Sequence, residues 1–222
     1  MRLFSYCLRY DDGAAPNPFH GICTLAICKP AIRRVAKLDD WIVGLGSLNS
    51  PIGNTSGRVI YAMKVTKILS FEGYDEYCRQ HLNFKIPYWR SNDFEKRVGD
   101  CIYDYSRRAG PFLRQSVHCE VNRDVDLSGK KVLLSDHFYY FGSSSIPLPH
   151  PLLPIVHQTQ GHKSYTNDNY VDLFVTWLES LGLKRNHVHG DPKLKAEIMS
   201  NSRSRLKCSK RDKEEDEKDE IC

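Results

Sequence analysis

The sequence predicts an α+β fold with several short strands, two longer helices and extended polar loops. Two observations lead to this prediction. Residues 58–68 alternate with the two-residue period of a strand, and residues 170–181 place apolar side chains at the spacing of a helix that packs on a core. The chain has 222 residues, 41% of them apolar and 11% aromatic, so it can bury a full core. We expect a single domain over residues 1–200 and a charged tail over residues 201–222.

Strand-like runs alternate with loops in the first part of the chain. A loop rich in Gly, Pro and Asn follows the first strand, and Pro30 ends a second apolar run. Asp39-Asp40 forms an acidic turn before the next strand, and Ser70 is suited to cap a helix. The elements expected here are strands at 3–10, 41–45 and 58–68, an apolar run at 22–28, a helical turn at 31–35 and a helix at 70–79.

The second part begins with an irregular polar segment, residues 85–97. Gly99-Asp100 introduces a short strand, and a loop rich in Pro separates the later strands from the last helix. Thr166 or Asn167 is expected to cap that helix, and Gly182 to end it. The elements expected here are strands at 101–105, 116–121 and 131–141 and a helix at 170–181.

The tail is strongly charged but electrically neutral. Residues 203–222 contain seven Lys or Arg and seven Asp or Glu and have almost no apolar residues, so we expect them to be disordered. The net charge of +5 therefore lies on the body of the protein. Such a surplus permits an anionic partner without requiring one.

Several classes of protein do not fit the sequence. No window reaches the roughly 18 apolar residues of a membrane helix, and the first residues lack the pattern of a signal peptide. None of the eight cysteines forms a Cys-x-x-Cys pair, which favours buried thiols over disulfides. His20, Cys23 and Cys28, with the distant His118 and Cys119, are the nearest approach to a zinc motif, and their spacing is wrong for a closed site. We expect a cytoplasmic protein with no membrane contact, no metal and no cofactor.

A glycine-containing segment resembles a phosphate-binding loop. Gly44-Leu45-Gly46 follows a strand, but the third glycine of a dinucleotide motif is missing and another strand follows in place of a helix. A Walker sequence is also absent. We interpret the segment as a β-hairpin in which the two glycines permit a close approach.

Several stretches of the sequence match motifs of a known family. They are Phe4-Ser5-Tyr6 with Asp11, residues 17–21, Cys28-Lys29-Pro30, residues 40–44, the strand from Arg58, residues 99–103, residues 135–142 and Gly161-His162-Lys163. On these stretches the chain resembles the nucleotide modification associated domain family, type two, over about residues 1–190, and more distantly the PUA-like superfamily with its EVE, ASCH and YTH domains. The PUA-like resemblance implies a mixed β-barrel with flanking helices. The family name implies a genomic association with systems that modify DNA bases, without naming a reaction.

The run Asp136-His137-Phe138-Tyr139-Tyr140-Phe141 is the most unusual part of the sequence. Four consecutive aromatic residues cannot all face one side of a strand. They form either a ligand-binding face, on which a base stacks beside Asp136, or a core strand covered on both sides. We favour Phe138 and Tyr140 for the ligand-binding face, because they share it with the carboxylate.

Three further positions are candidates for a base- or nucleotide-binding site. His20 lies in a loop with Asn17 and Phe19, Trp41 begins a strand, and His162 with Lys163 could hold a phosphate. The alternatives are a backbone-bonding turn, a core tryptophan and a solvated loop. If the protein is an enzyme, His20, Asp136, His137 and His162 are its candidate acid–base groups.

The leading hypothesis is a protein that recognises a modified base in an aromatic pocket, either in DNA or RNA or as a free nucleotide. An enzyme that modifies a base or nucleotide with the His/Asp set is the first alternative, and a protein-interaction module is the second. An imidazole that converges with a carboxylate would favour the enzyme. The sequence does not decide the base, the type of nucleic acid or the oligomeric state.

Overall fold

The computed structural model describes residues 1–156, 162–163 and 165–200, and its α+β class agrees with the sequence prediction. The tail at 201–222 lies outside the described residues, so its disorder stays a prediction. The strands are β1 (Leu3–Leu8), β2 (Cys23–Leu25), β3 (Trp41–Gly46), β4 (Arg58–Lys64), β5 (Lys67–Leu69), β6 (Tyr103–Asp104), β7 (Phe112–Leu113), β8 (Val132–Ser135), β9 (Phe138–Tyr140), β10 (Ile146–Pro147), β11 (His162–Lys163) and β12 (His187–Val188). The α-helices are α1 (Pro30–Val35), α2 (Phe71–His81), α3 (Phe94–Arg97), α4 (Arg123–Ser128), α5 (Val171–Ser180) and α6 (Lys195–Ser200). The 3-10 helices are η1 (Asn83–Lys85), η2 (Glu120–Asn122), η3 (Gly142–Ser144), η4 (His150–Ile155) and η5 (Tyr165–Tyr170).

The largest sheet has the strand order β11-β1-β3-β4-β9-β12, with β10 pairing with β4 as a seventh strand. β1 is parallel to β3, and β12 is parallel to β9, whereas the other pairs are antiparallel. Two smaller sheets have the orders β2-β8-β5 and β6-β7. The described strands form no closed barrel, so the PUA-like barrel expected from the resemblance is not confirmed.

Two chain segments bend and pass from the large sheet into the three-stranded sheet. Residues 58–69 supply β4 and then β5, and residues 132–140 supply β8 and then β9. The two segments pair with each other in both sheets, β4 with β9 and β5 with β8. Each strand predicted as one continuous element is therefore two strands with a bend between them.

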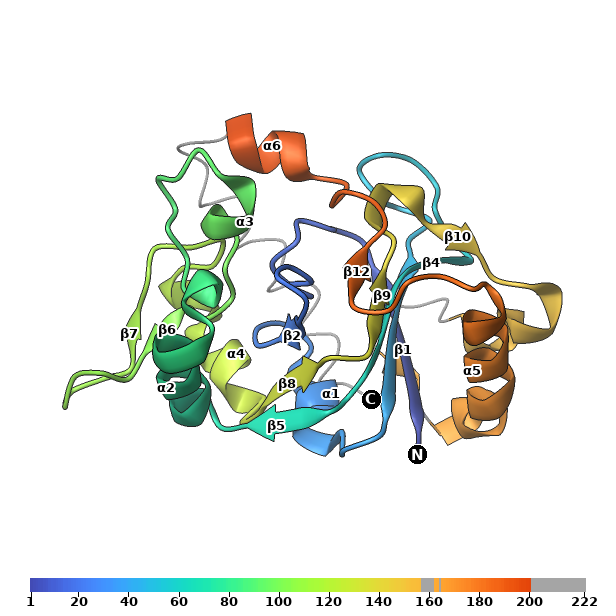
Figure 1. The fold of residues 1–222 in the computed structure, drawn as a ribbon, viewed down its shortest axis with the longest axis horizontal. Coiled ribbons are helices and arrows are strands. Elements are labelled where there is room, and N and C mark those ends of the chain that lie inside the picture. Colours follow the sequence, from blue (N-terminus) through green and yellow to red (C-terminus); the bar gives the residue numbers. More distant parts are fainter. Residues whose placement is uncertain (157–161, 164, 201–222) are drawn as a thin grey trace.

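The large sheet is covered on both faces. Figure 1 shows α5 on one side of it, and β2, β8, β5 and α1 on the other. Tyr139 and Phe141 pack toward α5 with Phe174, whereas Phe138 and Tyr140 pack in the cluster that contains residues of β2 and α1. The alternation of the aromatic run is thus confirmed, and both of its faces lie in the core.

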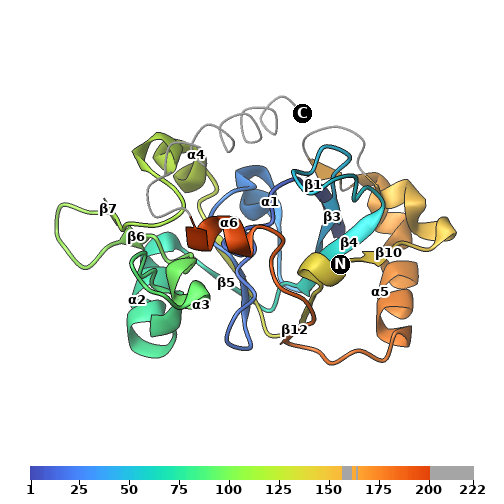
Figure 2. The same ribbon diagram turned by 90° about the horizontal axis from the view of Figure 1, so that it is seen from above.

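Helices α2, α3 and α4 and the β6–β7 hairpin lie at the end of the molecule that is farthest from α5 (Figure 2). A third apolar cluster lies here, centred on side chains of α2 and of the segment around Val98–Tyr103. Ser70 caps α2 as predicted, because its Oγ accepts a hydrogen bond from Gly73 N at 3.0 Å. The segment predicted to be irregular and polar contains the fully buried Lys85 and the short helix α3.

Two further elements differ from the sequence prediction. Residues 116–121 do not form a strand, since the described backbone there is irregular and leads into η2. Asn167 does not cap α5; its Nδ2 instead donates a hydrogen bond to Ser5 Oγ at 2.8 Å, and η5 precedes the helix. Tertiary packing determines the backbone conformation of residues 116–121 and the side-chain role of Asn167, and local sequence patterns do not report tertiary packing.

The two glycines of β3 do permit a close approach, but the approaching groups belong to this chain. A Cβ at Gly44 would lie 2.4 Å from the ring of Tyr61, and one at Gly46 would lie 2.0 Å from the carbonyl oxygen of Thr55. β3 and β4 form an antiparallel pair with a register irregularity at Gly44-Leu45. The glycines therefore serve the packing of the hairpin.

Candidate functional site

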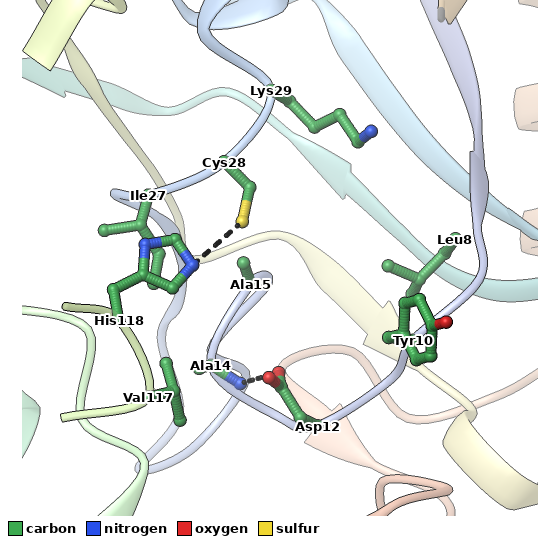
Figure 3. Close-up of a pocket in the computed structure, with 10 residues that line it drawn as sticks. All are labelled: Leu8, Tyr10, Asp12, Ala14, Ala15, Ile27, Cys28, Lys29, Val117 and His118. Atoms are coloured by element: carbon green, nitrogen blue, oxygen red, sulfur yellow. Dashed lines mark hydrogen bonds between the residues drawn. The ribbon is translucent and has the colours of Figure 1, made fainter. Parts of the chain in front are cut away.

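A pocket lies between the end of β1, the loop that follows it and the turn that follows β2 (Figure 3). Its empty volume is about 380 Å³, including the part open to solvent. Cys28 and His118 lie together on one side, and Leu8 and Tyr10 lie opposite. The lining residues are Leu8, Tyr10, Asp12, Ala14, Ala15, Ile27, Cys28, Lys29, Val117 and His118.

Cys28 sits on a tight turn between strand β2 and helix α1. Its φ is 58° and that of Lys29 is 44°, so two consecutive residues with side chains adopt the left-handed conformation. The turn is held by Cys28 N, which donates to Asp126 Oδ1 at 3.0 Å, and by Cys28 O, which accepts from Arg33 Nε at 2.7 Å. The partly exposed thiol is therefore fixed at the pocket wall.

His118 joins the thiol to a buried carboxylate. Its Nε2 lies 3.6 Å from Cys28 Sγ, and its Nδ1 lies 2.7 Å from Asp126 Oδ2. The His118 residue is 4% exposed, and Asp126 is fully buried. Cys28, His118 and Asp126 thus form a continuous chain of a thiol, an imidazole and a carboxylate.

Asp126 is surrounded by groups that favour its charged form. Burial alone would raise the pKa of Asp126, but the nearby charges of His118 and Arg33 and the hydrogen bonds from His118 and the Cys28 backbone hold that pKa below its ordinary value. The Tyr103 hydroxyl adds a further hydrogen bond to Oδ2 at 2.9 Å. An ionised carboxylate can only accept, so His118 Nδ1 donates to Asp126, and in the neutral imidazole Nε2 faces the thiol with a lone pair.

The rest of the pocket combines apolar surface with a few polar groups. Leu8, Ile27 and Val117 supply apolar contacts, and Tyr10 supplies a ring. The Lys29 ammonium lies 5.1 Å from the centre of the Tyr6 ring, and Asp12 Oδ1 accepts a hydrogen bond from Ala14 N at 2.9 Å.

Among the predicted site residues whose side chains the structure describes, none lines this pocket. Asn17 is buried, and its Oδ1 and backbone oxygen accept hydrogen bonds from Lys85 Nζ. Phe19 packs edge-on against Phe94 in the core. His20 is on the surface, where its Nε2 lies 3.3 Å from Glu95 Oε2; burial lowers its pKa, and Glu95 opposes the shift.

The second group of predicted residues lies around the bend between β8 and β9. Trp41 is 1% exposed and packs against Phe174 and, at a ring-centre distance of 5.2 Å, against His137. Burial, followed by the charge of Arg185, lowers the pKa of His137. Asp136 is exposed in the bend itself. No hydrogen bond or ion pair of the described residues joins Asp136 or His137 to His20.

The remaining predicted residues are in strands. Phe138 and Tyr140 are 0% exposed, and Tyr140 donates a hydrogen bond to Asp11 Oδ1. The backbones of His162 and Lys163 form β11, which pairs with β1, and their side chains lie outside the described residues. A binding role for any of these residues stays a prediction.

The sequence contained a partial signal for the site that the structure reveals. Cys28 and His118 stand out only as candidates for a weak zinc motif, and Cys28-Lys29-Pro30 only as part of the family resemblance. Cys28 and His118 are 90 residues apart in the sequence, so sequence patterns do not indicate that they are in contact. Within the described ranges, no group of three or more His, Cys, Asp or Glu side chains is arranged to hold a metal ion.

The fold and the pocket define an α+β protein in which a thiol and an imidazole converge at one wall of a small cleft. The chain belongs to the family described as nucleotide modification associated domain 2, whose model matches residues 1–201. No curated protein and no solved structure matches the chain. No described helix is long and apolar enough to cross a membrane.

Proposed function

We propose that this protein binds a nucleotide in the pocket beside Cys28 and acts on it as an enzyme of nucleotide modification. The observation that supports the proposal is the arrangement of Cys28, His118 and Asp126 at the pocket wall. A protein that only recognises a base needs stacking surfaces and hydrogen-bonding groups. It has no need of a thiol beside an imidazole that a buried carboxylate orients.

The rest of the pocket is suited to a nucleotide. The partly exposed ring of Tyr10 can stack on a base at the pocket. Recognition of a modified base without chemistry, which the sequence favours, would use the same pocket and remains the alternative.

The test measures whether nucleotides bind in this pocket. Titration calorimetry is run with a panel of ribonucleoside and deoxyribonucleoside monophosphates and with short oligonucleotides that contain plain, methylated and hydroxymethylated bases. A bound member of the panel should also protect Cys28 from alkylation by iodoacetamide. Binding that leaves the alkylation rate of Cys28 unchanged would place the ligand elsewhere.

A pair of matched variants sharpens the test. Ala15→Leu adds bulk to the pocket wall, whereas Ala109→Leu makes the same change at an exposed position. We expect the first to weaken binding at least about tenfold, equivalent to about 1.4 kcal/mol, and the second to leave binding unchanged. Equal binding by both variants would contradict the proposed pocket.

A further inference from the structure

We propose that Cys28 is a covalent nucleophile, with His118 as its general base and Asp126 as the residue that positions His118. The substrate class named below rests on the proposed function, but the reactivity of the thiol does not. The order strand, tight turn, helix presents Cys28 at the apex of a turn, as in enzymes that carry a nucleophile on such an elbow.

The conformation of this turn is unfavourable without support. A non-glycine residue in the left-handed region is strained, and Cys28 and Lys29 both adopt this conformation. The hydrogen bonds from Cys28 N to Asp126 and from Arg33 to Cys28 O hold the turn in place. Asp126 therefore binds the thiol-bearing turn with one carboxylate oxygen and His118 with the other.

The hydrogen-bonding pattern defines a route for the thiol proton. His118 Nδ1 donates to Asp126, so Nε2 is available to accept the proton of Cys28 across 3.6 Å. Asp126 then stabilises the imidazolium that results. The distance is longer than in a tight pair, as is common before a substrate is bound.

The reaction that follows is addition to a polarised double bond. The Cys28 proton moves to His118 Nε2, an S–C bond forms at the electrophilic carbon, and the π electron pair moves to the far end of the conjugated system. The imidazolium gives its proton to the carbon next to the attacked one, so the net change is addition of S–H across the carbon–carbon double bond with no oxidant, reductant or cofactor. A pyrimidine offers such a carbon at C6, in conjugation with C4, so a pyrimidine nucleotide is the substrate class that we infer.

Several charged or titratable groups surround the thiol. Lys29 adjoins it and Arg33 binds its carbonyl, and their positive charges favour the thiolate, as does the imidazolium that His118 becomes when it takes the thiol proton. The negative charges of Asp126 on α4 and of Asp12 across the pocket disfavour the thiolate. Tyr6 and Tyr61 lie on the sheet side, and burial raises the pKa of each well above its ordinary value, so both stay neutral.

The first experiment follows alkylation by iodoacetamide in the full chain, with each cysteine peptide measured by mass spectrometry from pH 5 to 10. Cys7 and Cys119 are also partly exposed and serve as references within the same molecule. We expect Cys28 to react at least tenfold faster than either at pH 7, with its half-maximal rate below the ordinary cysteine value of about 8.5. His118→Gln should remove this advantage and leave the reference cysteines unchanged.

A variant that unfolds would expose all cysteines, so the melting temperature of each protein is measured in parallel. Asp126→Asn is a second variant that should slow Cys28. An amide can donate a hydrogen bond to His118 Nδ1, and this favours the tautomer in which Nε2 carries the proton and cannot accept that of the thiol. A Cys28 that reacts no faster than Cys7 and Cys119 in the folded wild-type protein would overturn the proposal. So would a fast Cys28 that is unaffected by both folded variants.

The second experiment tests the substrate class. Reversible addition at C6 exchanges the C5 hydrogen with solvent, so uridine and deoxycytidine monophosphates are incubated with the protein in D₂O and followed by proton NMR. We expect loss of the C5 signal with wild-type protein and none with Cys28→Ser. A reactive Cys28 without exchange would refute the pyrimidine assignment, and nucleotide binding with an ordinary Cys28 would preserve the proposed binding function while refuting the nucleophile.

Discussion

The Tyr140 hydroxyl donates a hydrogen bond to Asp11 Oδ1 in the protein interior. Asp11 Oδ2 accepts a second hydrogen bond from Lys193 N at 3.2 Å, and Asp11 O accepts one from Leu194 N at 2.9 Å. The pair therefore connects strand β9, the loop after β1 and the segment that leads into α6. Burial raises the pKa of Asp11 to about 6, and the bonds from Tyr140 and Lys193 oppose the rise.

Asp11 should make the protein less stable as the pH rises toward neutrality. Its folded pKa of about 6 lies above the ordinary 3.8, so the folded state binds more protons between these values. The resulting stability is fully present below about pH 4 and is lost as the pH rises through about 6, a change of about 3 kcal/mol. Asp11→Asn should remove this component from the difference in unfolding free energy between pH 4.5 and 7, as measured by urea denaturation.

Asp136→Asn is the matched control for this measurement, because Asp136 is exposed in the bend between β8 and β9. Its profile should follow that of the wild type. If Asp11→Asn also reproduces the wild-type profile, Asp11 does not titrate in this window in the folded protein.

The aromatic run offers a direct test of core against binding site. Phe138 is 0% exposed, so Phe138→Leu should lower the unfolding free energy by about 1–3 kcal/mol through lost packing. Tyr139→Leu, on the opposite face, should have an effect of similar size. Nucleotide affinity of the folded variants, measured by calorimetry, should stay at the wild-type value. Loss of affinity without loss of stability at Phe138 would instead support the binding face that the sequence favours.

The sequence predicted local structure better than it predicted the site. Alternation located β4 and β9, and Ser70 located the start of α2, because these signals depend on neighbours in the chain. The bends that divide 58–69 and 132–140 between two sheets were missed, since they depend on how the two segments pair. Periodicity assigned the faces of the aromatic run correctly, but it could not report that α5 and β2 cover both faces.

The pocket could not be predicted for a related reason. Cys28, His118 and Asp126 come from a turn, an irregular segment and the short helix α4. The packing of α1 against α4, with Arg33 bonded to Cys28 O and Asp126 O, brings Cys28 and Asp126 together, and Asp126 then binds His118. Conversely, the described histidines and aromatics among the predicted site residues lie in the core or at the surface away from this pocket, and the sequence alone does not report that separation.

Lys85 should be essential for stability. Its buried ammonium donates to Asn17 O and to Ile22 O, each at 2.9 Å, and to Asn17 Oδ1, so it holds both ends of the loop that carries His20. Burial lowers the pKa of Lys85, and the charge of Asp100 opposes this. Lys85→Met should lower the unfolding free energy by about 3–5 kcal/mol in urea denaturation, because it leaves buried acceptors and Asp100 uncompensated.

The exposed Lys96 supplies the comparison. Its ammonium lies 3.8 Å from Asp93 on the surface, so Lys96→Met should change stability by less than about 1 kcal/mol. Similar values for the two variants would mean that the buried network around Lys85 contributes little.

Any binding of nucleic acid should depend weakly on salt. A net charge of +5 on a body of this size is compatible with about two to four phosphate contacts. The slope of log affinity against log salt for duplex DNA should then be about −2 to −4, and shallower for a single strand. Fluorescence anisotropy over a salt series measures it. A slope near −8 would indicate an extended basic groove and a polymer as the preferred ligand.

Arg33 should control the reactivity of Cys28 without lining the pocket. Its buried guanidinium donates to Cys28 O, Lys131 O and Asp126 O, and so ties the thiol-bearing turn to α4. A lysine cannot span these three acceptors with one ammonium. Arg33→Lys should therefore lower the unfolding free energy by about 2–4 kcal/mol and slow the alkylation of Cys28 at pH 7 severalfold in the protein that remains folded.

Arg34→Lys is the matched control, because it makes the same change one residue along α1. Among the hydrogen bonds described, the Arg34 side chain contacts only Ser128, so this variant should leave Cys28 as reactive as in the wild type. If Arg33→Lys destabilises the protein but does not alter the rate or pH profile of Cys28, the turn is held by Asp126 alone, and Arg33 is a structural residue of the core.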